Sequence, residues 1–455
     1  MIKRTLKQIE NMITVQNDLS TFSSLEIEGV CIDSRRIEKG NLFIPFKGER
    51  MDGHEFVHQA IEDGASAALW EKSAGEPPAN LPIIVVDNSL QALQDLARSY
   101  RQQLNAKVVG ITGSNGKTTT KDIAASLLSL QYKVQKTEGN YNSHIGLPLT
   151  ILGMEENTEV MVLEMGMSGK GEIAELTHIA SPEVVVITNI GESHLQDLGS
   201  REGIAQAKLE IIEGLTESGL LVYFGEEPLL VERIRSLSIR AETFGKEKGN
   251  TIFPTSLEAN QKGTFFSTNI TKNQSFFLPI LGEHNVLNTM AAMLVAKELD
   301  VHLEQAQQAL DNVRLTGMRL ETVKGAKGET IINDAYNASP TSTRAAIDLL
   351  ASLKGYHQKV LVLGDMLELG TEEEAFHTEI GNYIPLEEID YVMTYGPLAE
   401  KLAEAANMRG HGKVFSFQNK EELVQRMKET IQFGDVVLFK ASRGMKLEEV
   451  VEKLM

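Results

Sequence analysis

The sequence predicts an α/β protein of three domains: a small N-terminal α/β domain, a central mostly parallel sheet and a C-terminal Rossmann-like doubly wound domain. A chain of 455 residues is too long for one ordinary hydrophobic core, and about 150 residues per domain predicts three domains. Hydrophobic residues make up 42% and charged residues 24%, as in globular proteins. Apolar strands alternate with helical segments, which favours parallel sheets covered on both faces. We place the domains at residues 1–86, 87–312 and 313–455.

The first two segments of the chain predict a small domain and a connecting helix. Residues 41–46 read as a strand and residues 54–63 as a helix, and the apolar run 65–70 follows. Residues 89–104 then have apolar side chains at three- and four-residue spacing, which predicts a helix with Ser89 as its N-cap. The boundary between the first two domains therefore precedes Ser89.

The two larger domains repeat the alternation of strand and helix. In the central domain the predicted strands are 107–112, 160–163 and 184–190, and the predicted helices are 118–130, 203–215 and 285–299, with further β-type segments in 220–280. In the C-terminal domain the predicted strands are 331–332, 359–363, 391–393, 414–415 and 436–439. Helical segments separate most of the latter, which predicts a second doubly wound sheet.

A glycine-rich loop at residues 110–120 is typical of nucleotide phosphate binding. It follows an apolar strand and opens a helix, so its N–H groups and the helix N-terminus favour an anion. Lys117 can reach the β- and γ-phosphates, and the Thr118 hydroxyl can bind Mg²⁺. Ile111 stands where the strict pattern has glycine, so the loop is a variant. The alternative is a glycine-rich turn with a chance Lys-Thr pair.

Three further side chains are candidates for a metal site. Glu164 and His194 follow apolar strands, where the loops of parallel sheets form the ligand crevice. Each also has an interpretation without a metal: Glu164 as an acid that faces solvent, and His194 as a loop histidine without function. Lys208 shares a helix face with apolar residues, and a lysine there is costly unless it has partners. It either extends to the edge of the core or is a functional, chemically altered lysine.

Composition excludes several classes of protein. The net charge is −19, which repels a phosphate backbone, so nucleic acid is not an expected partner. The single cysteine, Cys31, allows no intrachain disulfide and no Cys-based zinc site, and we interpret it as a buried small hydrophobe. No signal peptide and no run of about 18 apolar residues is found. We therefore expect a cytoplasmic protein without membrane insertion.

The phosphate loop, Glu164 with His194, and the inward Lys208 together resemble the Mur ligases, which add amino acids to the peptidoglycan precursor. The similarity runs through the whole chain. Residues 33–36, 40–45 and 48–54 look like the domain that binds the UDP-linked substrate, and residues 140–148 look like the substrate segment of the central domain, with Ser143 where the family often has asparagine. Residues 283–285 with Asn288 look like the adenine-side motif.

The C-terminal domain distinguishes between members of the family. Residues 333–340, Asn-Asp-Ala-Tyr-Asn-Ala-Ser-Pro, resemble the members that add D-alanyl-D-alanine, and no Asp-Asn-Pro-Arg signature of the diaminopimelate-adding members is found. Ser339 and Pro340 also suit the N-cap and first position of a helix. Part of this motif is therefore equally interpretable as structural.

The resemblance implies an ATP-dependent ligase that joins D-alanyl-D-alanine to UDP-N-acetylmuramoyl-tripeptide through an acyl phosphate, with Mg²⁺, as a monomer. It implies catalytic roles for Lys117, Glu164, His194, Lys208 and Arg319, and metal ligands from Thr118, Glu164, His194 and a carbamate on Lys208. It implies ATP contacts by Gly113, Ser114, Asn115, Gly116, Lys117, Thr118, Thr119, Asn285, Asn288, Arg319 and Asp334. It implies UDP-substrate contacts by Ser34, Arg35, Lys47, Gly48, Asn140 and Asn142, and dipeptide contacts by Tyr336, Asn337, Ser339, Lys440, Ser442 and Arg443.

Three alternatives stay open at this point. The sister ligase that adds the third amino acid lacks the 333–340 type of segment. Folylpolyglutamate synthase has similar central and C-terminal domains but lacks this type of N-terminal domain. A nucleotide-gated binding protein without turnover has no need of a second cation. The sequence also leaves both lysine and diaminopimelate open as the third residue of the accepted peptide.

Overall fold

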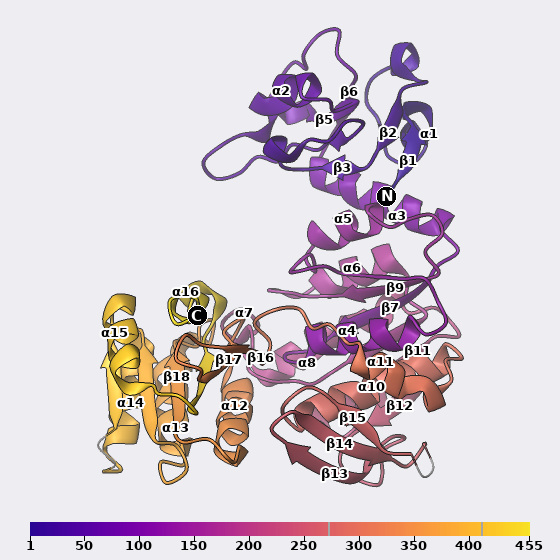
Figure 1. Ribbon diagram of the computed structural model, residues 1–455. Coiled ribbons are helices and arrows are strands. Elements are labelled where there is room, and N and C mark those ends of the chain that lie inside the picture. Colours follow the sequence, from indigo (N-terminus) through magenta and orange to yellow (C-terminus); the bar gives the residue numbers. More distant parts are fainter. Residues whose placement is uncertain (272–273, 411–412) are drawn as a thin grey trace.

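The computed structural model describes residues 1–271, 274–410 and 413–455, arranged as three α/β domains (Figure 1). The N-terminal domain, indigo at the top of the view, has a parallel sheet in the order β3-β4-β5-β6 and a separate antiparallel pair, β1-β2. The strands are β1 Lys3–Thr5, β2 Glu26–Glu28, β3 Val30–Cys31, β4 Leu42–Phe43, β5 Ala67–Glu71 and β6 Ile83–Val86, and the α-helices are α1 Leu6–Glu10 and α2 Val57–Glu62.

Three predictions in this region were wrong in detail. The strand expected over 41–46 shortens to Leu42–Phe43, and Pro45, which has no N–H to donate, lies just beyond it. The helix expected over 54–63 begins as a 3-10 turn at Gly53–Phe56. Cys31 is half-buried, with its Sγ donating to the carbonyl of Asp33 at 3.2 Å.

Helix α3, Ser89–Gln103, connects the first domain to the second. Its N-cap is Asn88, whose side chain accepts from the Gln91 N–H, and not Ser89, which is the first helical residue and is buried. The apolar stripe predicted from the spacing is buried, and α3 packs on α5 (Gly146–Leu152) and α6 (Glu172–Ala180). The helix thus rests on the central domain.

The central sheet has six parallel strands in the order β12-β11-β10-β7-β9-β8. Its strands are β7 Lys107–Thr112, β8 Val134–Lys136, β9 Val160–Glu164, β10 Val184–Ile187, β11 Leu220–Phe224 and β12 Arg240–Phe244. The remaining helices are α4 Lys117–Leu128, α7 Leu195–Leu198, α8 Arg201–Leu209, α9 Pro228–Ile234, α10 His284–Glu298 and α11 Ala306–Asp311. A small antiparallel sheet, β13 Pro254–Asn260, β14 Gly263–Thr268 and β15 Phe276–Leu278, lies beside α11.

Two central elements end earlier than predicted. The strand expected over 184–190 ends at Ile187, because Thr188 and Asn189 leave the sheet and hydrogen-bond the phosphate loop. The helix expected over 203–215 is α8 from Arg201 to Leu209, followed by a 3-10 turn. Within the described residues, no helix has the length and apolarity that a membrane span requires.

The C-terminal sheet has the order β16-β17-β21-β18-β19-β20, with only β16 antiparallel to its neighbour. The five predicted strands are confirmed as β17 Thr330–Asp334, β18 Lys359–Gly364, β19 Tyr391–Tyr395, β20 Val414–Phe417 and β21 Val436–Lys440. The edge strand β16, Glu321–Lys324, was not predicted, because it is mostly exposed and has a single apolar residue. The helices are α12 Pro340–Ser352, α13 Glu373–Tyr383, α14 Pro397–Asn407, α15 Lys420–Thr430 and α16 Glu448–Glu452.

Candidate active site

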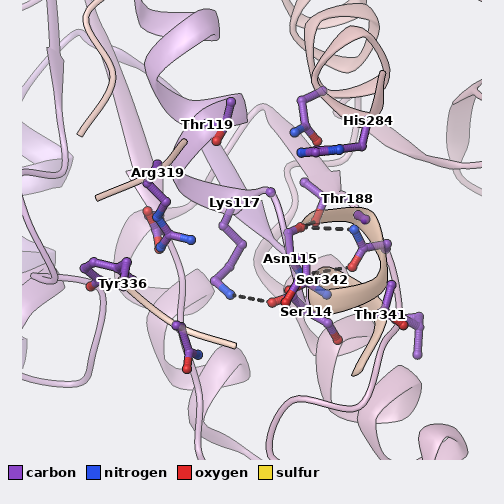
Figure 2. A pocket seen from close by; sticks show the side chains of 18 of the residues that line it. Ser114, Asn115, Lys117, Thr119, Thr188, His284, Arg319, Tyr336, Thr341 and Ser342 are labelled. Carbon is purple, nitrogen blue, oxygen red and sulfur yellow. Dashed lines mark hydrogen bonds between the residues drawn. The ribbon is translucent and has the colours of Figure 1, made fainter. Parts of the chain in front are cut away.

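A cavity of about 650 Å³ lies between the central and C-terminal domains. The loops after β7, β9 and β10 reach it, as do the start of α10 and the loop after β17 (Figure 2). Parallel sheets place the carboxyl ends of their strands at one edge, which is where ligands bind in such folds. Among its lining residues are Asn115, Lys117, Glu164, Arg319, Tyr336 and Lys440.

The phosphate loop has the form that its glycines require. Gly113 has φ +146°, and a Cβ there would lie 1.8 Å from the Thr188 Oγ1 atom, so only glycine fits. Gly116, at φ +80°, precedes the first residue of α4, Lys117. The Lys117 Nζ atom donates to the carbonyl of Gly113 at 2.7 Å, and burial lowers the pKa of this lysine, although the charge of Glu164 opposes the shift. Ile111 is buried in β7, so the departure from the strict pattern falls in the strand.

Thr118 and Glu164, two residues of the predicted metal site, are in contact at the start of α4. The Thr118 hydroxyl donates to Glu164 Oε2 at 2.9 Å, and Asn142 Nδ2 donates to Oε1 at 2.8 Å. Arg319 Nη2 in turn donates to Thr118 Oγ1 at 3.0 Å. Two buried donors, Nδ2 of Asn115 and Nε of Arg319, have no hydrogen-bond partner in the part of the chain that the structure describes. Unpaired buried donors are costly, and an anionic ligand would satisfy them.

His194 and Lys208 contribute differently to this region. His194 lines the cavity with a left-handed backbone, φ +64°, and its Nδ1 atom lies 2.9 Å from Glu368 Oε2 of the C-terminal domain. Lys208 is buried, and burial, followed by the charge of Lys117, holds its pKa well below the usual range. Among the described residues, no hydrogen bond or opposite charge acts on its ammonium. No group of three His, Cys, Asp or Glu side chains in those residues is arranged to hold a metal.

The predicted adenine-side residues lie at the start of α10, next to the phosphate loop. Asn288 Nδ2 donates to Asn285 Oδ1 at 3.0 Å, and a Cβ on Gly116 would lie 2.6 Å from Asn288 Oδ1. His284 belongs to the predicted adenine-side motif but had no role of its own, and it lines the cavity, where burial lowers its pKa. Two aromatic residues that line the cavity, Phe224 and Phe244, were not predicted, and their ring centroids lie 5.7 Å apart. Phe224 ends the apolar strand β11, whereas the strand that Phe244 ends, β12, is mostly polar, so no common pattern in the sequence marks the two rings.

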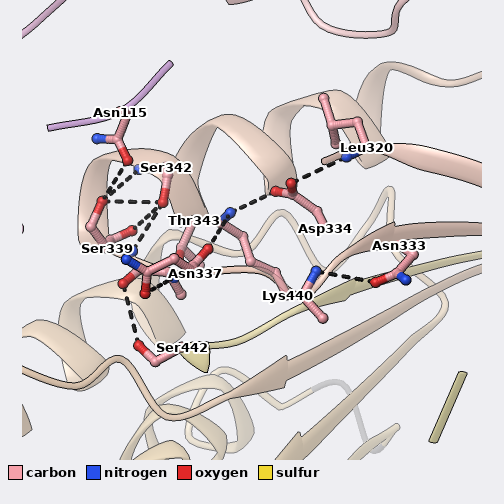
Figure 3. Close-up of polar contacts among 12 residues, drawn as sticks. Asn115, Leu320, Asn333, Asp334, Asn337, Ser339, Ser342, Thr343, Lys440 and Ser442 are labelled. Carbon is pink, nitrogen blue, oxygen red and sulfur yellow. Dashed lines mark hydrogen bonds and ion pairs between the residues drawn. The ribbon is translucent and has the colours of Figure 1, made fainter. Parts of the chain in front are cut away.

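The C-terminal domain brings most of its predicted residues to the cavity. Lys440 Nζ donates to Asp334 Oδ2 at 2.6 Å and to the carbonyl of Asn337 at 3.1 Å (Figure 3). The guanidinium of Arg319 lies 4.1 Å from the centre of the Tyr336 ring. These contacts fix two cations on one side of the cavity.

Three predicted dipeptide residues do not line the cavity. Ser339 is the N-cap of α12, as its alternative interpretation expected, and its hydroxyl also donates to Asn115 Oδ1 at 3.3 Å. Ser442 is buried, and its hydroxyl accepts from the Leu367 N–H at 2.9 Å. Arg443 pairs with Glu448 at 2.7 Å on the surface.

The predicted contacts to the UDP-linked substrate divide between two places. Asn142 lines the cavity, but Asn140 does not. Ser34, Arg35, Lys47 and Gly48 belong to the N-terminal domain and do not line the cavity either. Arg35 is 86% exposed, and its bond to Asp33 lowers the pKa of that carboxyl to about 2.

Fold and site together define a three-domain nucleotide-binding protein in which a phosphate loop faces the cations of a Rossmann-like domain. Family models match three stretches: the Mur ligase family catalytic domain at 26–101, the Mur ligase middle domain at 111–296, and the Mur ligase glutamate ligase domain at 318–443. The chain belongs to the Mur ligase family.

Individual relatives narrow the comparison. The chain is 52% identical to the UDP-N-acetylmuramoyl-tripeptide–D-alanyl-D-alanine ligase of Bacillus subtilis, over 100% of this chain and 99% of that protein. A crystal structure of MurF from Acinetobacter baumannii is 31% identical, with a TM-score of 0.91 over 100% of this chain and 99% of that one. MurF from Thermotoga maritima in complex with ADP is also 31% identical, with a TM-score of 0.83 over 96% and 98%.

Proposed function

We propose that the chain is an ATP-dependent ligase that joins D-alanyl-D-alanine to UDP-N-acetylmuramoyl-tripeptide, a step of peptidoglycan precursor synthesis. The observation that carries the proposal is one cavity shared by a phosphate loop and by Arg319, Tyr336 and Lys440 of the C-terminal domain. The identity of 52% over the full length of a ligase with this name supports the substrates, against the sister ligase and the folate enzyme.

The reaction needs activation, because a carboxylate has too poor a leaving group to react with an amine. The terminal carboxylate of the tripeptide attacks the γ-phosphorus of ATP, and the bond to the β,γ-bridging oxygen breaks, which leaves ADP. The amine of the dipeptide then attacks the acyl phosphate, and the tetrahedral adduct expels phosphate and loses a proton. The products are the pentapeptide precursor, ADP and phosphate.

The chain's own residues bring these anions together. The N–H groups of the phosphate loop, Lys117 and Arg319 stabilise the charge that develops on the transferred phosphoryl group. Nε of Arg319 and Nδ2 of Asn115, which have no partner among the described residues, are buried donors for the same anion. Asn285 and Asn288 lie on the adenine side, and Tyr336, Asn337 and Lys440 on the side of the dipeptide.

Mg²⁺ fits the oxygen donors of Thr118 and Glu164, which are already in contact. When bound, the ion would neutralise charge on the phosphates. His194 and Lys208 suit a second cation if Lys208 carries a carbamate, which turns a buried amine into a carboxylate. Carbamylation requires a neutral amine, and the lowered pKa of Lys208 supplies one.

Phosphate release tests the proposal. The chain is incubated with ATP, Mg²⁺ and UDP-N-acetylmuramoyl-tripeptide, with and without D-alanyl-D-alanine, and the product mass is measured. We expect release that depends on both substrates, and the mass of the joined pentapeptide. Turnover of the dipeptide precursor with lysine or diaminopimelate, but none with D-alanyl-D-alanine, would assign the chain to the sister ligase.

A further inference from the structure

The loop that follows β10, residues 188–199, is joined firmly to the phosphate loop. The Asn115 N–H donates to Asn189 Oδ1 at 2.9 Å, and the Gly191 N–H donates to Ser114 Oγ at 2.8 Å. The Ser114 N–H also donates to the carbonyl of Asn189 at 3.0 Å. A displacement of the phosphate loop therefore has to move this loop with it.

The same loop holds the C-terminal domain at a first point, Glu192. Its carboxylate accepts from the Thr341 N–H at 3.2 Å and from the Thr341 hydroxyl at 2.8 Å. Thr341 is the second residue of α12, so its N–H has no partner within the helix. A carboxylate is also favoured there by the positive end of the helix dipole.

A second point of contact lies further along the loop, where His194 and Gln196 meet Glu368. Its Oε2 atom lies 2.9 Å from His194 Nδ1, and its carbonyl accepts from the Gln196 N–H at 3.1 Å. His194 and Glu368 both have left-handed backbones, at φ +64° and +65°. Non-glycine residues hold this conformation at a cost, so surrounding contacts must maintain it.

The segment that carries Glu368 is anchored within its own domain. The Met366 N–H donates to Nε2 of the buried His377 at 2.9 Å, and the Leu367 N–H donates to Ser442 Oγ at 2.9 Å. Both sides of the contact are thus rigidly mounted, one on the phosphate loop and the other on the C-terminal sheet.

We propose that Glu192 and Glu368 form a two-point latch that holds the C-terminal domain against the phosphate loop, and that both are positioning residues for the reaction. The part that concerns turnover rests on the proposed ligase function. The latch couples the two halves of the cavity, because loop 188–199 contacts the phosphate loop on one side and α12 and Glu368 on the other.

Hydrogen exchange of the Gln196 amide measures directly how often the latch opens, because the Gln196 N–H donates to the carbonyl of Glu368. Exchange tracks the population of the opened contact, so weakening a charged hydrogen bond should raise the rate about tenfold. We expect this increase in Glu192→Ala, Glu368→Gln and Thr341→Val, measured by mass spectrometry on overlapping peptides. Thr341→Ser keeps the hydroxyl and should leave the rate unchanged.

Glu210→Ala is the matched control. Glu210 accepts from the N–H groups of Gly171 and Ala174 at the start of α6, within the central domain, so its loss should not change exchange at Gln196. An unchanged Gln196 rate in Glu192→Ala and Glu368→Gln, or an equal rise in Glu210→Ala, would overturn the latch.

Kinetics test the positioning role. In Glu192→Ala we expect about a tenfold lower kcat or higher KM for the dipeptide, which the C-terminal domain binds, with a smaller change in the Kd for ATP, because the phosphate loop itself stays intact. An equal weakening of ATP binding would contradict this role. Failure of the wild-type chain to form the pentapeptide would refute the proposed function, whereas the exchange experiment would still decide the latch.

Discussion

Arg319 donates a hydrogen bond to the hydroxyl of Thr118, 201 residues earlier in the chain, at 3.0 Å. Thr118 belongs to the first turn of α4, and Arg319 to the segment that enters the C-terminal domain. The guanidinium also lies over the Tyr336 ring, so its direction is set by two contacts. The bond places a permanent cation beside the phosphate loop.

Replacing Arg319 with lysine should lower kcat/KM about 100-fold, because lysine lacks the planar fork that reaches Thr118 and an anion together. Steady-state phosphate release measures the loss. Arg314→Lys is the control, since Arg314 is exposed in the same junction. Equal activity of the two variants would argue against a role for Arg319 at the γ-phosphate.

Replacement by methionine should change the free energy of unfolding in opposite directions at two buried lysines. Lys208 is buried with no hydrogen bond or opposite charge on its ammonium among the described residues, so Lys208→Met should raise the free energy of unfolding while it abolishes phosphate release. Lys121 donates to the carbonyl of Thr137 at 2.7 Å and lies 3.4 Å from Asp122, so Lys121→Met should destabilise the protein. Denaturant unfolding compares them.

A ¹³C-bicarbonate label adds a direct readout of Lys208. We expect a carbamate signal in the wild type that disappears in Lys208→Met and persists in Lys121→Met. A wild-type spectrum without that signal would count against a carbamate on Lys208.

Gly113 should tolerate no side chain. In Gly113→Ala the Cβ would collide with Thr188 Oγ1, 1.8 Å away, so we expect the loss of ATP binding and about 2 kcal/mol or more of stability. Gly171→Ala separates strain from collision, because Gly171 also has a positive φ but nothing lies within 4 Å of its Cβ. Gly171→Ala should lower the free energy of unfolding by about 1 kcal/mol. Calorimetric titration with ATP and denaturant unfolding check both.

His377 should make stability depend on pH. Burial lowers its pKa below the ordinary 6.5, and its Nε2 atom accepts from the Met366 N–H, as only an unprotonated Nε2 can. Below pH 6.5 the unfolded chain therefore binds a proton at this histidine that the folded chain does not bind. The stabilisation that His377 contributes is present above pH 6.5 and is lost as the pH falls. Unfolding of His377→Gln should depend less steeply on pH over this range than the wild type. His302→Gln, an exposed control, should match the wild type.

Much of the fold was readable from local patterns. The strand Lys107–Thr112 was predicted with its bounds, and the five parallel C-terminal strands were all found. These signals depend only on neighbours in the chain, such as a continuous apolar run or a glycine-rich turn before a helix. Two features that depend on tertiary surroundings were not predicted from the sequence. They are Asn88 in place of Ser89 as the N-cap of α3, and the exposed edge strand β16.

The sequence by itself determined the phosphate loop, the alternation of strands and helices, and the inward position of Lys208, because each is encoded in the spacing of adjacent residues. Only the tertiary structure decided which distant groups meet. Arg319 reaches Thr118 and Glu192 reaches Thr341 across the domain junction, whereas Arg35 stays away from the cavity. Contacts between residues more than a hundred positions apart leave no periodic trace in the chain, since they arise from how separately folded sheets pack.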